Sequence, residues 1–170
     1  MRDQLDRFGE IDYTANLLRQ IANATSNTVV LNREDYRIAS IAKSLDKQKI
    51  KYFGIDSKLL PLFPSDDDLH KSSFDNSIKP EADVLLQSFS GSSAVFIING
   101  KKIKTDLKLN GIYNVFNAAA ALTLVRAIIN DETGRDDLIK ALAGVEPAFG
   151  RGETIEIDGK PLELILVKNP

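Results

Sequence analysis

The sequence predicts an α/β protein with a mostly parallel sheet, helices on both faces and an antiparallel edge hairpin. Three observations support this fold class. Segments with helical spacing of apolar residues alternate with short β-rich runs along residues 10–55, a pattern typical of βα units. An Asn-Gly pair at 99–100 lies between two further β-rich runs and predicts a tight hairpin. The alanine-rich segment after it predicts a long helix.

The individual elements follow from the spacing of apolar residues and from the turn residues between them. Apolar positions three, four and seven residues apart predict helices at 10–24, 35–45, 112–130 and 136–142. Runs with β pattern predict strands at 28–31, 51–55, 83–89, 94–98 and 103–109. A second hairpin is expected around Asp158-Gly159, between 153–157 and 162–167.

Residues 56–80 interrupt this regularity. They contain three prolines and the acidic triplet 66–68, and no apolar periodicity. We therefore predict an exposed loop there. The acidic triplet lacks the glycine and the spaced ligands of a calcium loop, so it is interpreted as solvated charge.

Composition excludes several functional classes. The 170 residues carry 22 basic and 24 acidic side chains and are 43% hydrophobic, which suits one soluble domain with a sizeable core. No apolar run approaches the roughly 20 residues of a membrane span. The absence of cysteine excludes disulfides and thiolate zinc sites. A net charge of −2 argues against nucleic-acid binding, and we expect a cytoplasmic protein. The single histidine, His70, has no visible partner and receives no catalytic role.

Short segments in one order resemble a known family. They are residues 2–12 (RDQLDRFGEID), 30–35 (VLNRED), 111–118 (GIYNVFNA), 149–153 (FGRGE) and 166–170 (LVKNP). Together they resemble the MurT-like branch of the Mur ligases, the ligase subunits that amidate the D-glutamate of the lipid II stem peptide. The resemblance implies that 1–147 form part of a Mur ligase middle domain. Residues 148–170 would then begin the C-terminal domain with its first hairpin.

The sequence departs from that family in three places. It contains no glycine loop of the form G-x-x-x-x-G-K-[ST], the loop that cradles nucleotide phosphates. The chain is therefore expected to begin after that loop. It also lacks the four-cysteine zinc ribbon that many such proteins insert after the strand at 51–55, so zinc is not expected. Gln4 stands where many Mur ligases have a metal-facing histidine, and no metal ligand is assigned.

The resemblance assigns five residues to a nucleotide site. Asn114 matches the position whose amide meets adenine, and Arg151 matches the arginine that meets phosphate. Asn117 is grouped with Asn114, because residues three apart at the start of a helix project to one face. The matching C-terminal positions at the nucleotide edge are Lys168 and Asn169. An alternative interpretation of the two asparagines is that they only cap the helix. The alternative for Arg151 is a solvated cation in a flexible glycine loop. No catalytic residue is assigned.

The implied reaction is ATP-driven activation of a carboxylate as an acyl phosphate, with Mg²⁺ as the counter-charge, followed by attack of ammonia from a glutaminase partner of the GatD type. The full-length protein would need the missing glycine loop for this, so the 170-residue chain alone is expected to be inactive. Two alternatives stay open: a folylpolyglutamate-synthase-like or amino-acid-adding Mur-type ligase, and a non-catalytic α/β module that binds a partner. The exposed terminal strand predicts pairing with another copy of the chain.

Overall fold

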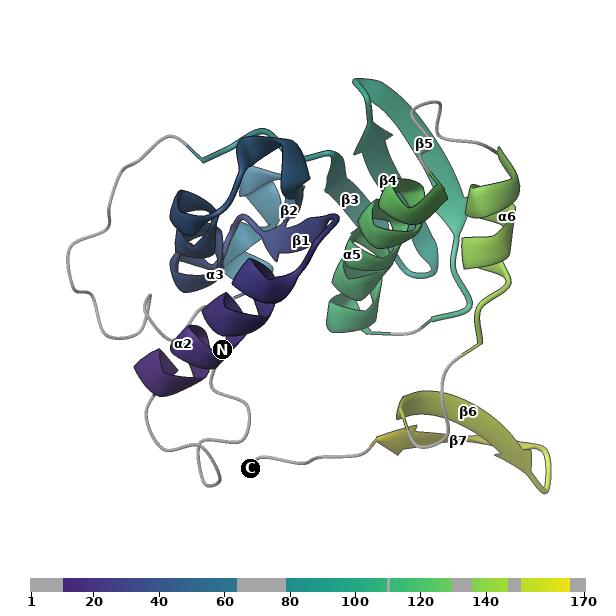
Figure 1. Ribbon diagram of the computed structural model, residues 1–170. Helices are drawn as coiled ribbons and strands as arrows, with labels where there is room; N and C mark the ends of the chain where they lie inside the picture. The colour runs from purple at the N-terminus through teal and green to yellow at the C-terminus, as the bar shows by residue number, and fades with distance from the viewer. Residues whose placement is uncertain (1–10, 64–78, 110, 130–135, 147–150, 166–170) are drawn as a thin grey trace.

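The computed structural model describes residues 11–63, 79–109, 111–129, 136–146 and 151–165 (Figure 1). Its α-helices are α2 (Ile11–Ala24), α3 (Tyr36–Ser40), α5 (Ile112–Ile129) and α6 (Asp136–Ala143). Its strands are β1 (Val29–Asn32), β2 (Ile50–Ile55), β3 (Val84–Ser90), β4 (Ser93–Ile98), β5 (Lys101–Asp106), β6 (Arg151–Ile157) and β7 (Lys160–Ile165). Short 3-10 helices are η1 (Ile41–Ser44), η2 (Lys47–Lys49) and η3 (Ser57–Leu62).

The main sheet has the strand order β1-β2-β3-β4-β5. The first three strands are parallel, with Asn32 opposite Phe53 and Phe53 opposite Val84. The last two strands are antiparallel and form the predicted hairpin. Its turn residues Asn99 and Gly100 have φ angles of 50° and 74°, the positive values that a type I′ turn requires. The predicted fold class is confirmed.

Helix α5 covers one face of this sheet and supplies four of the twelve buried residues of the main core. Small residues and leucine face the strands, which lets the helix approach closely. The buried side chains of this core come from β2, β3, β4, the segment after β5, α5 and α6: Ile55, Val84, Leu86, Ala94, Phe96, Ile98, Leu107, Val115, Ala118, Ala119, Leu122 and Leu142. Helix α5 is also long and apolar enough, by length and composition alone, to cross a membrane. Its buried face shows that it packs on the sheet instead.

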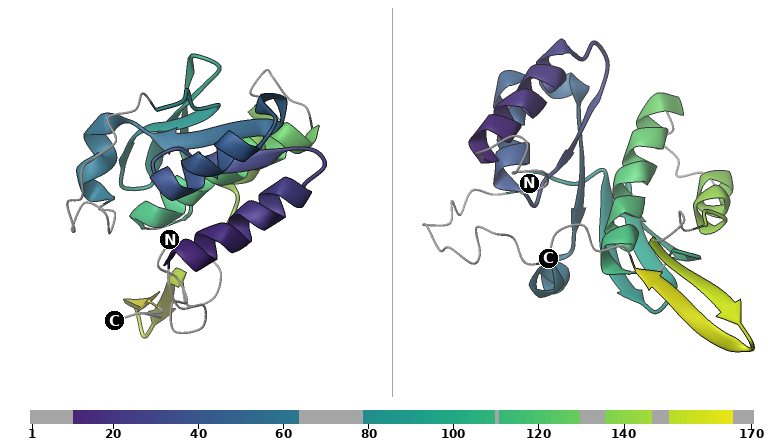
Figure 2. Two further views of the ribbon diagram at one scale, coloured as in Figure 1. Left: turned by 60° about the vertical axis from the view of Figure 1, so that its left-hand side comes forward. Right: turned by 90° about the horizontal axis from the view of Figure 1, so that it is seen from below.

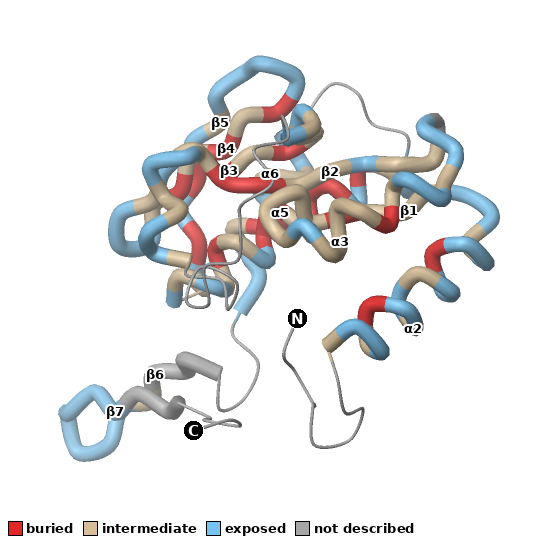
Figure 3. The backbone as a smooth tube through the Cα atoms, turned by 90° about the vertical axis from the view of Figure 1, so that its left-hand side faces the viewer, coloured by how far each residue is buried: buried red, intermediate tan, exposed pale blue. Residues whose placement is uncertain are grey.

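The opposite face of β1 and β2 carries a second, smaller core. Leu31 of β1 packs there with Ala22 of α2 and Ile41 of η1. The right-hand view of Figure 2 shows α5 on one side of β2 and α2 and α3 on the other. Helix α2 buries only Ala15 and Ala22, and the rest of the helix is partly or fully exposed (Figure 3).

Two predicted segments differ from the structure. The helix expected at 35–45 is a short α-helix followed by a 3-10 turn that ends before Leu45, which has extended φ and ψ. The exposed loop expected from residue 56 begins instead with η3, which contains Pro61. Leu60 of η3 and Phe63 after it pack against the main core, so the loop prediction was wrong for these residues.

The hairpin predicted at Asp158-Gly159 is confirmed. Strands β6 and β7 form a separate two-stranded antiparallel sheet, visible apart from the main sheet in Figure 1. Asp158 and Gly159 have φ angles of 51° and 73°. The division into domains at 147–148 stays a prediction.

Candidate functional site

The carboxyl ends of the parallel strands are the first place to look for a site, because ligands of open α/β sheets bind outside those ends. Strand β1 ends at Asn32 and β2 at Ile55. Helix α5 begins at the same edge, since Phe116 in its second turn packs on Phe53 of β2 with ring centroids 5.2 Å apart. The segment after β1, the end of β2 and the start of α5 therefore meet at one edge of the sheet.

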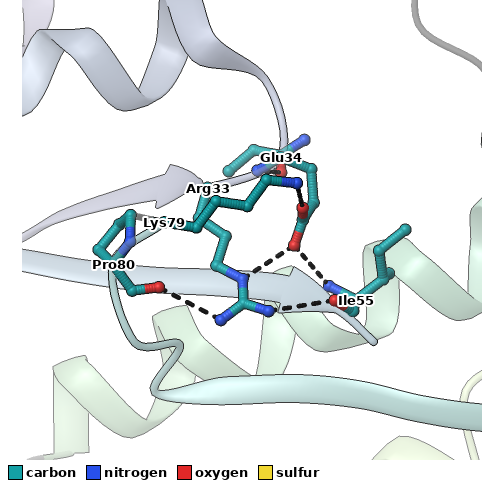
Figure 4. A network of polar contacts seen from close by, with 6 residues as sticks. Arg33, Glu34, Ile55, Lys79 and Pro80 are labelled. Atoms are coloured by element: carbon teal, nitrogen blue, oxygen red, sulfur yellow. Dashed lines mark hydrogen bonds and ion pairs between the residues drawn. The ribbon is translucent and has the colours of Figure 1, made fainter. Parts of the chain in front are cut away.

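Arg33 and Glu34 form a polar network at this edge (Figure 4). The Arg33 guanidinium donates from Nε to Glu34 Oε1 at 2.8 Å, from Nη2 to the Ile55 carbonyl at 3.1 Å and from Nη1 to the Pro80 carbonyl at 3.2 Å. Glu34 Oε1 also accepts the backbone N–H of Ile55 at 3.1 Å, and Oε2 accepts Lys79 Nζ at 2.5 Å. The network ties the ends of β1 and β2 to the segment that leads into β3.

The local sequence explains why these two side chains point this way. The backbone N–H of Arg33 continues the sheet by donating to the Phe53 carbonyl at 3.1 Å. Asn32 Oδ1 accepts the N–H of Glu34 at 2.9 Å and turns the chain. Gly54 leaves the necessary room, because a Cβ there would collide with Arg33 and lie 2.7 Å from Glu34 Oε1.

Glu34 is the one carboxylate of this network, and its side chain is only 10% exposed. Burial raises the pKa of Glu34, but hydrogen bonds from Lys79, Arg33 and the Ile55 backbone, with the charge of Lys79, lower it more. The net pKa of Glu34 therefore lies below its usual value. Glu34 is ionised at neutral pH and serves as a fixed negative charge that orients Arg33.

A cavity of about 390 Å³ lies beside Arg33. Leu85 of β3 and Ile97 of β4 line it. Because neighbouring strand residues point to opposite faces and Val84, Leu86, Phe96 and Ile98 are in the α5 core, this cavity lies on the face away from α5. It includes neither of the two predicted asparagines.

Asn114 and Asn117 lie in the first two turns of α5, as the sequence predicts. Gly111, with φ of 90°, precedes the helix, and its carbonyl accepts the N–H groups of Asn114 at 3.1 Å and Val115 at 3.3 Å. Asn114 is partly buried and Asn117 is exposed. The first turn contains no acidic residue, so the partial positive charge of the helix start is left uncompensated by its own side chains.

The other predicted site residues are not brought to α5 by what the structure describes. Arg151 is the first residue of β6, opposite Ile165, and only its backbone is described. Lys168, Asn169 and Gln4 lie outside the described residues. Within the described ranges, no three His, Asp or Glu side chains gather to hold a metal ion. The described residues therefore offer no carboxylate cluster for Mg²⁺, and the roles of the predicted site residues stay predictions.

The fold and this edge define an open α/β domain with a mixed five-stranded sheet, and sequence comparison identifies its family. Residues 1–125 match the model of the Mur ligase middle domain. The chain belongs to the Mur ligase family.

Relatives of known identity agree with this assignment. The chain is 29% identical to the MurT subunit of lipid II isoglutaminyl synthase (glutamine-hydrolyzing) from Streptococcus pneumoniae, over 99% of the chain and 42% of that protein. Among solved structures, a pseudomurein peptide ligase type C from Methanothermus fervidus gives a TM-score of 0.69 at 22% identity, over 92% of this chain and 34% of the other. MurF from Acinetobacter baumannii gives a TM-score of 0.64 at 17% identity, over 94% of this chain and 30% of the other. The chain thus spans less than half the length of these relatives.

Proposed function

We propose that this chain supplies part of the nucleotide-binding half of a MurT-like ligase subunit that acts in the cytoplasm. The supporting observation is the placement of Asn114 and Asn117 on the first turns of α5, at the carboxyl edge of the parallel strands. The Mur ligase middle-domain match includes both residues. Asn114 is the proposed adenine contact, and its amide can both donate to and accept from a base edge.

The proposed reaction is the amidation of the D-glutamate carboxylate of the lipid II stem peptide. A carboxylate is a poor electrophile until phosphorylation gives it a leaving group, and ATP with Mg²⁺ would supply that phosphoryl group in the full-length protein. Ammonia would come from a glutamine amidotransferase subunit of the GatD type. The amidating branch is preferred because the curated relative that the chain matches, at 29% identity over 99% of the chain, is a MurT subunit.

In this proposal the chain's own residues bind and orient the nucleotide. Asn114 and Asn117 would contact the base side from α5, and the N–H groups at the start of α5 would face negative charge. Arg151 is the proposed phosphate contact, and Lys168 and Asn169 would border the nucleotide from the C-terminal domain. The glycine loop that holds the remaining phosphates would have to come from outside this chain.

Isothermal titration with Mg-ATP tests the proposal on a longer protein that includes an upstream glycine loop. Asn114→Ala and Arg151→Ala should each weaken binding by about tenfold or more, the equivalent of about 1.4 kcal/mol for a lost hydrogen bond to a charged or buried group. Asn27→Ala, at an exposed site before β1, is the matched control and should bind normally. Unchanged affinity of the Asn114 variant would remove this residue from the site.

The partner and the isolated chain give two further tests. Co-purification of a glutamine amidotransferase with the longer protein would support the amidating branch, whereas consumption of a free amino acid in place of glutamine would support an amino-acid-adding ligase. The 170-residue chain alone should not hydrolyse ATP, and robust turnover by it would contradict the proposed division of the site.

A further inference from the structure

Tyr113 is an exposed aromatic residue in the first turn of helix α5, directly before Asn114. Its ring meets Phe63 edge-on, with centroids 5.8 Å apart and an angle of 86° between the ring planes. Tyr113 is nevertheless 61% exposed, so this contact covers only a small part of the ring. Most of a flat aromatic surface therefore stays open beside the proposed adenine contact.

The Tyr113 ring is supported by a series of further aromatic contacts. Phe63 packs on Phe116 with centroids 5.3 Å apart, and Phe116 packs on Phe53 at 5.2 Å. Phe53 belongs to β2, so these contacts connect Tyr113 to the main sheet. A side chain that is ordered before its ligand arrives loses less conformational entropy on binding. The exposed ring of Tyr113 is therefore a preorganised surface.

Tyr113 and the two asparagines share one side of the start of α5. At 100° per residue, positions 113, 117 and 114 follow one another within about 100° of arc. No charged side chain occurs from Ile112 to Asn117, and Asn117 is exposed like Tyr113. An open aromatic face with neutral hydrogen-bond donors and acceptors beside it suits a planar heteroaromatic ring such as a nucleobase.

We propose that Tyr113 stacks on the base of the bound nucleotide, while Asn114 binds the edge of the same base. This inference rests on the proposed nucleotide site and adds to it a contact with the flat face of the base. Stacking requires no particular donors or acceptors, because every base has an aromatic face. Tyr113 thus supplies affinity, and the amide of Asn114, which both donates and accepts, recognises the edge.

Isothermal titration of the longer protein with two ligands tests this role. Mg-ATP carries a base, whereas magnesium tripolyphosphate carries only the phosphates. Tyr113→Leu should weaken the binding of Mg-ATP by at least about fivefold, the lower end of what one stacked base contributes. The same variant should bind magnesium tripolyphosphate with unchanged affinity. Tyr113→Phe keeps the ring and should bind Mg-ATP as the wild-type protein does.

Tyr13→Leu is the matched control, because Tyr13 is an exposed tyrosine of α2, with 54% of its surface accessible. This variant should bind both ligands normally. Tyr113 is itself mostly exposed, so its replacement should leave the fold intact. Far-ultraviolet circular dichroism of Tyr113→Leu should match the wild-type spectrum, which assigns any loss of Mg-ATP affinity to the missing ring rather than to unfolding.

Nuclear magnetic resonance gives a readout that does not depend on affinity. In the longer protein with isotope-labelled tyrosine, the ring signals of Tyr113 are those that disappear in Tyr113→Phe. A stacked purine shields the ring protons beneath it, so these signals should move upfield when Mg-ATP is added and should stay in place with magnesium tripolyphosphate. The signals of Tyr13 and Tyr36, which are exposed on α2 and α3, should not move.

The possible outcomes separate this inference from the proposed function. If Asn114→Ala weakens the binding of Mg-ATP but Tyr113→Leu does not, the proposed base site stands without Tyr113. If neither variant changes the affinity, the proposed nucleotide site fails and the stacking role fails with it. An equal loss of Mg-ATP and tripolyphosphate binding in Tyr113→Leu would indicate a purely structural role. Tyr113 ring signals that stay in place with Mg-ATP would likewise overturn the stacking.

Discussion

Glu34 and Ile55 are joined across the ends of two parallel strands: Glu34 Oε1 accepts the backbone N–H of Ile55 at 3.1 Å. Regular pairing of β1 with β2 ends at Asn32 and Phe53, so a side chain satisfies a backbone donor just beyond the ladder. The same carboxylate orients the Arg33 guanidinium, which reaches the Ile55 carbonyl. Both polar groups of the Ile55 backbone are thus bound by side chains from the segment after β1.

The first prediction concerns the charge of Glu34. Glu34→Gln keeps the shape of the side chain but removes the charge that binds Arg33 and Lys79. We expect a loss of about 1–3 kcal/mol in the free energy of unfolding, with most of it from Arg33, because Lys79 is 45% exposed and screened by solvent. Urea denaturation at neutral pH, followed by circular dichroism, measures this loss.

The lowered pKa of Glu34 gives this effect a pH dependence. An unfolded glutamate has a pKa near 4.5, and the folded pKa lies below that value. The stabilisation is therefore complete above pH 4.5 and is lost as the pH falls through the folded pKa. The stability difference between the wild-type chain and Glu34→Gln should shrink on acidification. A difference that stays constant down to low pH would show that the charge is not its source.

The second prediction concerns the space that Gly54 leaves for this network. A Cβ at position 54 would collide with Arg33 and crowd Glu34 Oε1, so Gly54→Ala should displace the pair and cost about 1–3 kcal/mol. Gly144→Ala is the matched control. Its Cβ would lie 3.5 Å from the Ala141 carbonyl, an ordinary contact, and neither glycine has a positive φ. Equal stabilities of the two variants would argue against a tight site at Gly54.

Local sequence signals were sufficient where local chemistry decides the structure. The hairpins at Asn99-Gly100 and Asp158-Gly159 were predictable because these pairs tolerate the positive φ angles that the turns contain. The alanine-rich sequence likewise predicted α5 within a residue at each end. Helix α3 ends early, although the apolar spacing continues, because the chain tightens into a 3-10 turn before Leu45.

Contacts between distant residues were not predictable in this way. Arg33 and Pro80 are 47 residues apart, and nothing local indicates that they meet. Because Pro61 favours a loop, the sequence did not predict that Leu60 and Phe63 pack on the core. For the site, Asn114 and Asn117 came from the family resemblance, while the Arg33 network was missed. Charged residues directly after a buried strand were the one signal that could have found it.

The third prediction concerns Arg126, a buried cation in the last turn of α5. It is 7% exposed, and its Nη1 donates to the Asp83 carbonyl at 3.3 Å. Arg126→Ala removes both the hydrogen bond and the packing of the long side chain, and we expect a loss of about 2–4 kcal/mol. Arg126→Met restores most of the volume and should cost about 1 kcal/mol or less. If the methionine variant is as unstable as the alanine variant, the hydrogen bond outweighs the packing.

The fourth prediction concerns the aromatic cluster that anchors the start of α5. Phe116 packs on Phe53 and on Phe63 with centroids 5.2 and 5.3 Å apart. Tyr113 meets Phe63 edge-on at 5.8 Å. Phe116→Ala removes the central ring and should lower the free energy of unfolding by about 2–4 kcal/mol, less than for a fully buried phenylalanine.

The control for Phe116 is Tyr13→Ala, at an aromatic residue of α2 that is 54% exposed, and it should change stability by less than about 0.5 kcal/mol. Because the chain contains no tryptophan, circular dichroism is the suitable probe for both variants. The cluster also positions Asn114, two residues before Phe116. In the longer protein, Phe116→Leu should therefore weaken Mg-ATP binding while most of the stability is retained. Normal affinity of that variant would separate the anchoring of α5 from the nucleotide site.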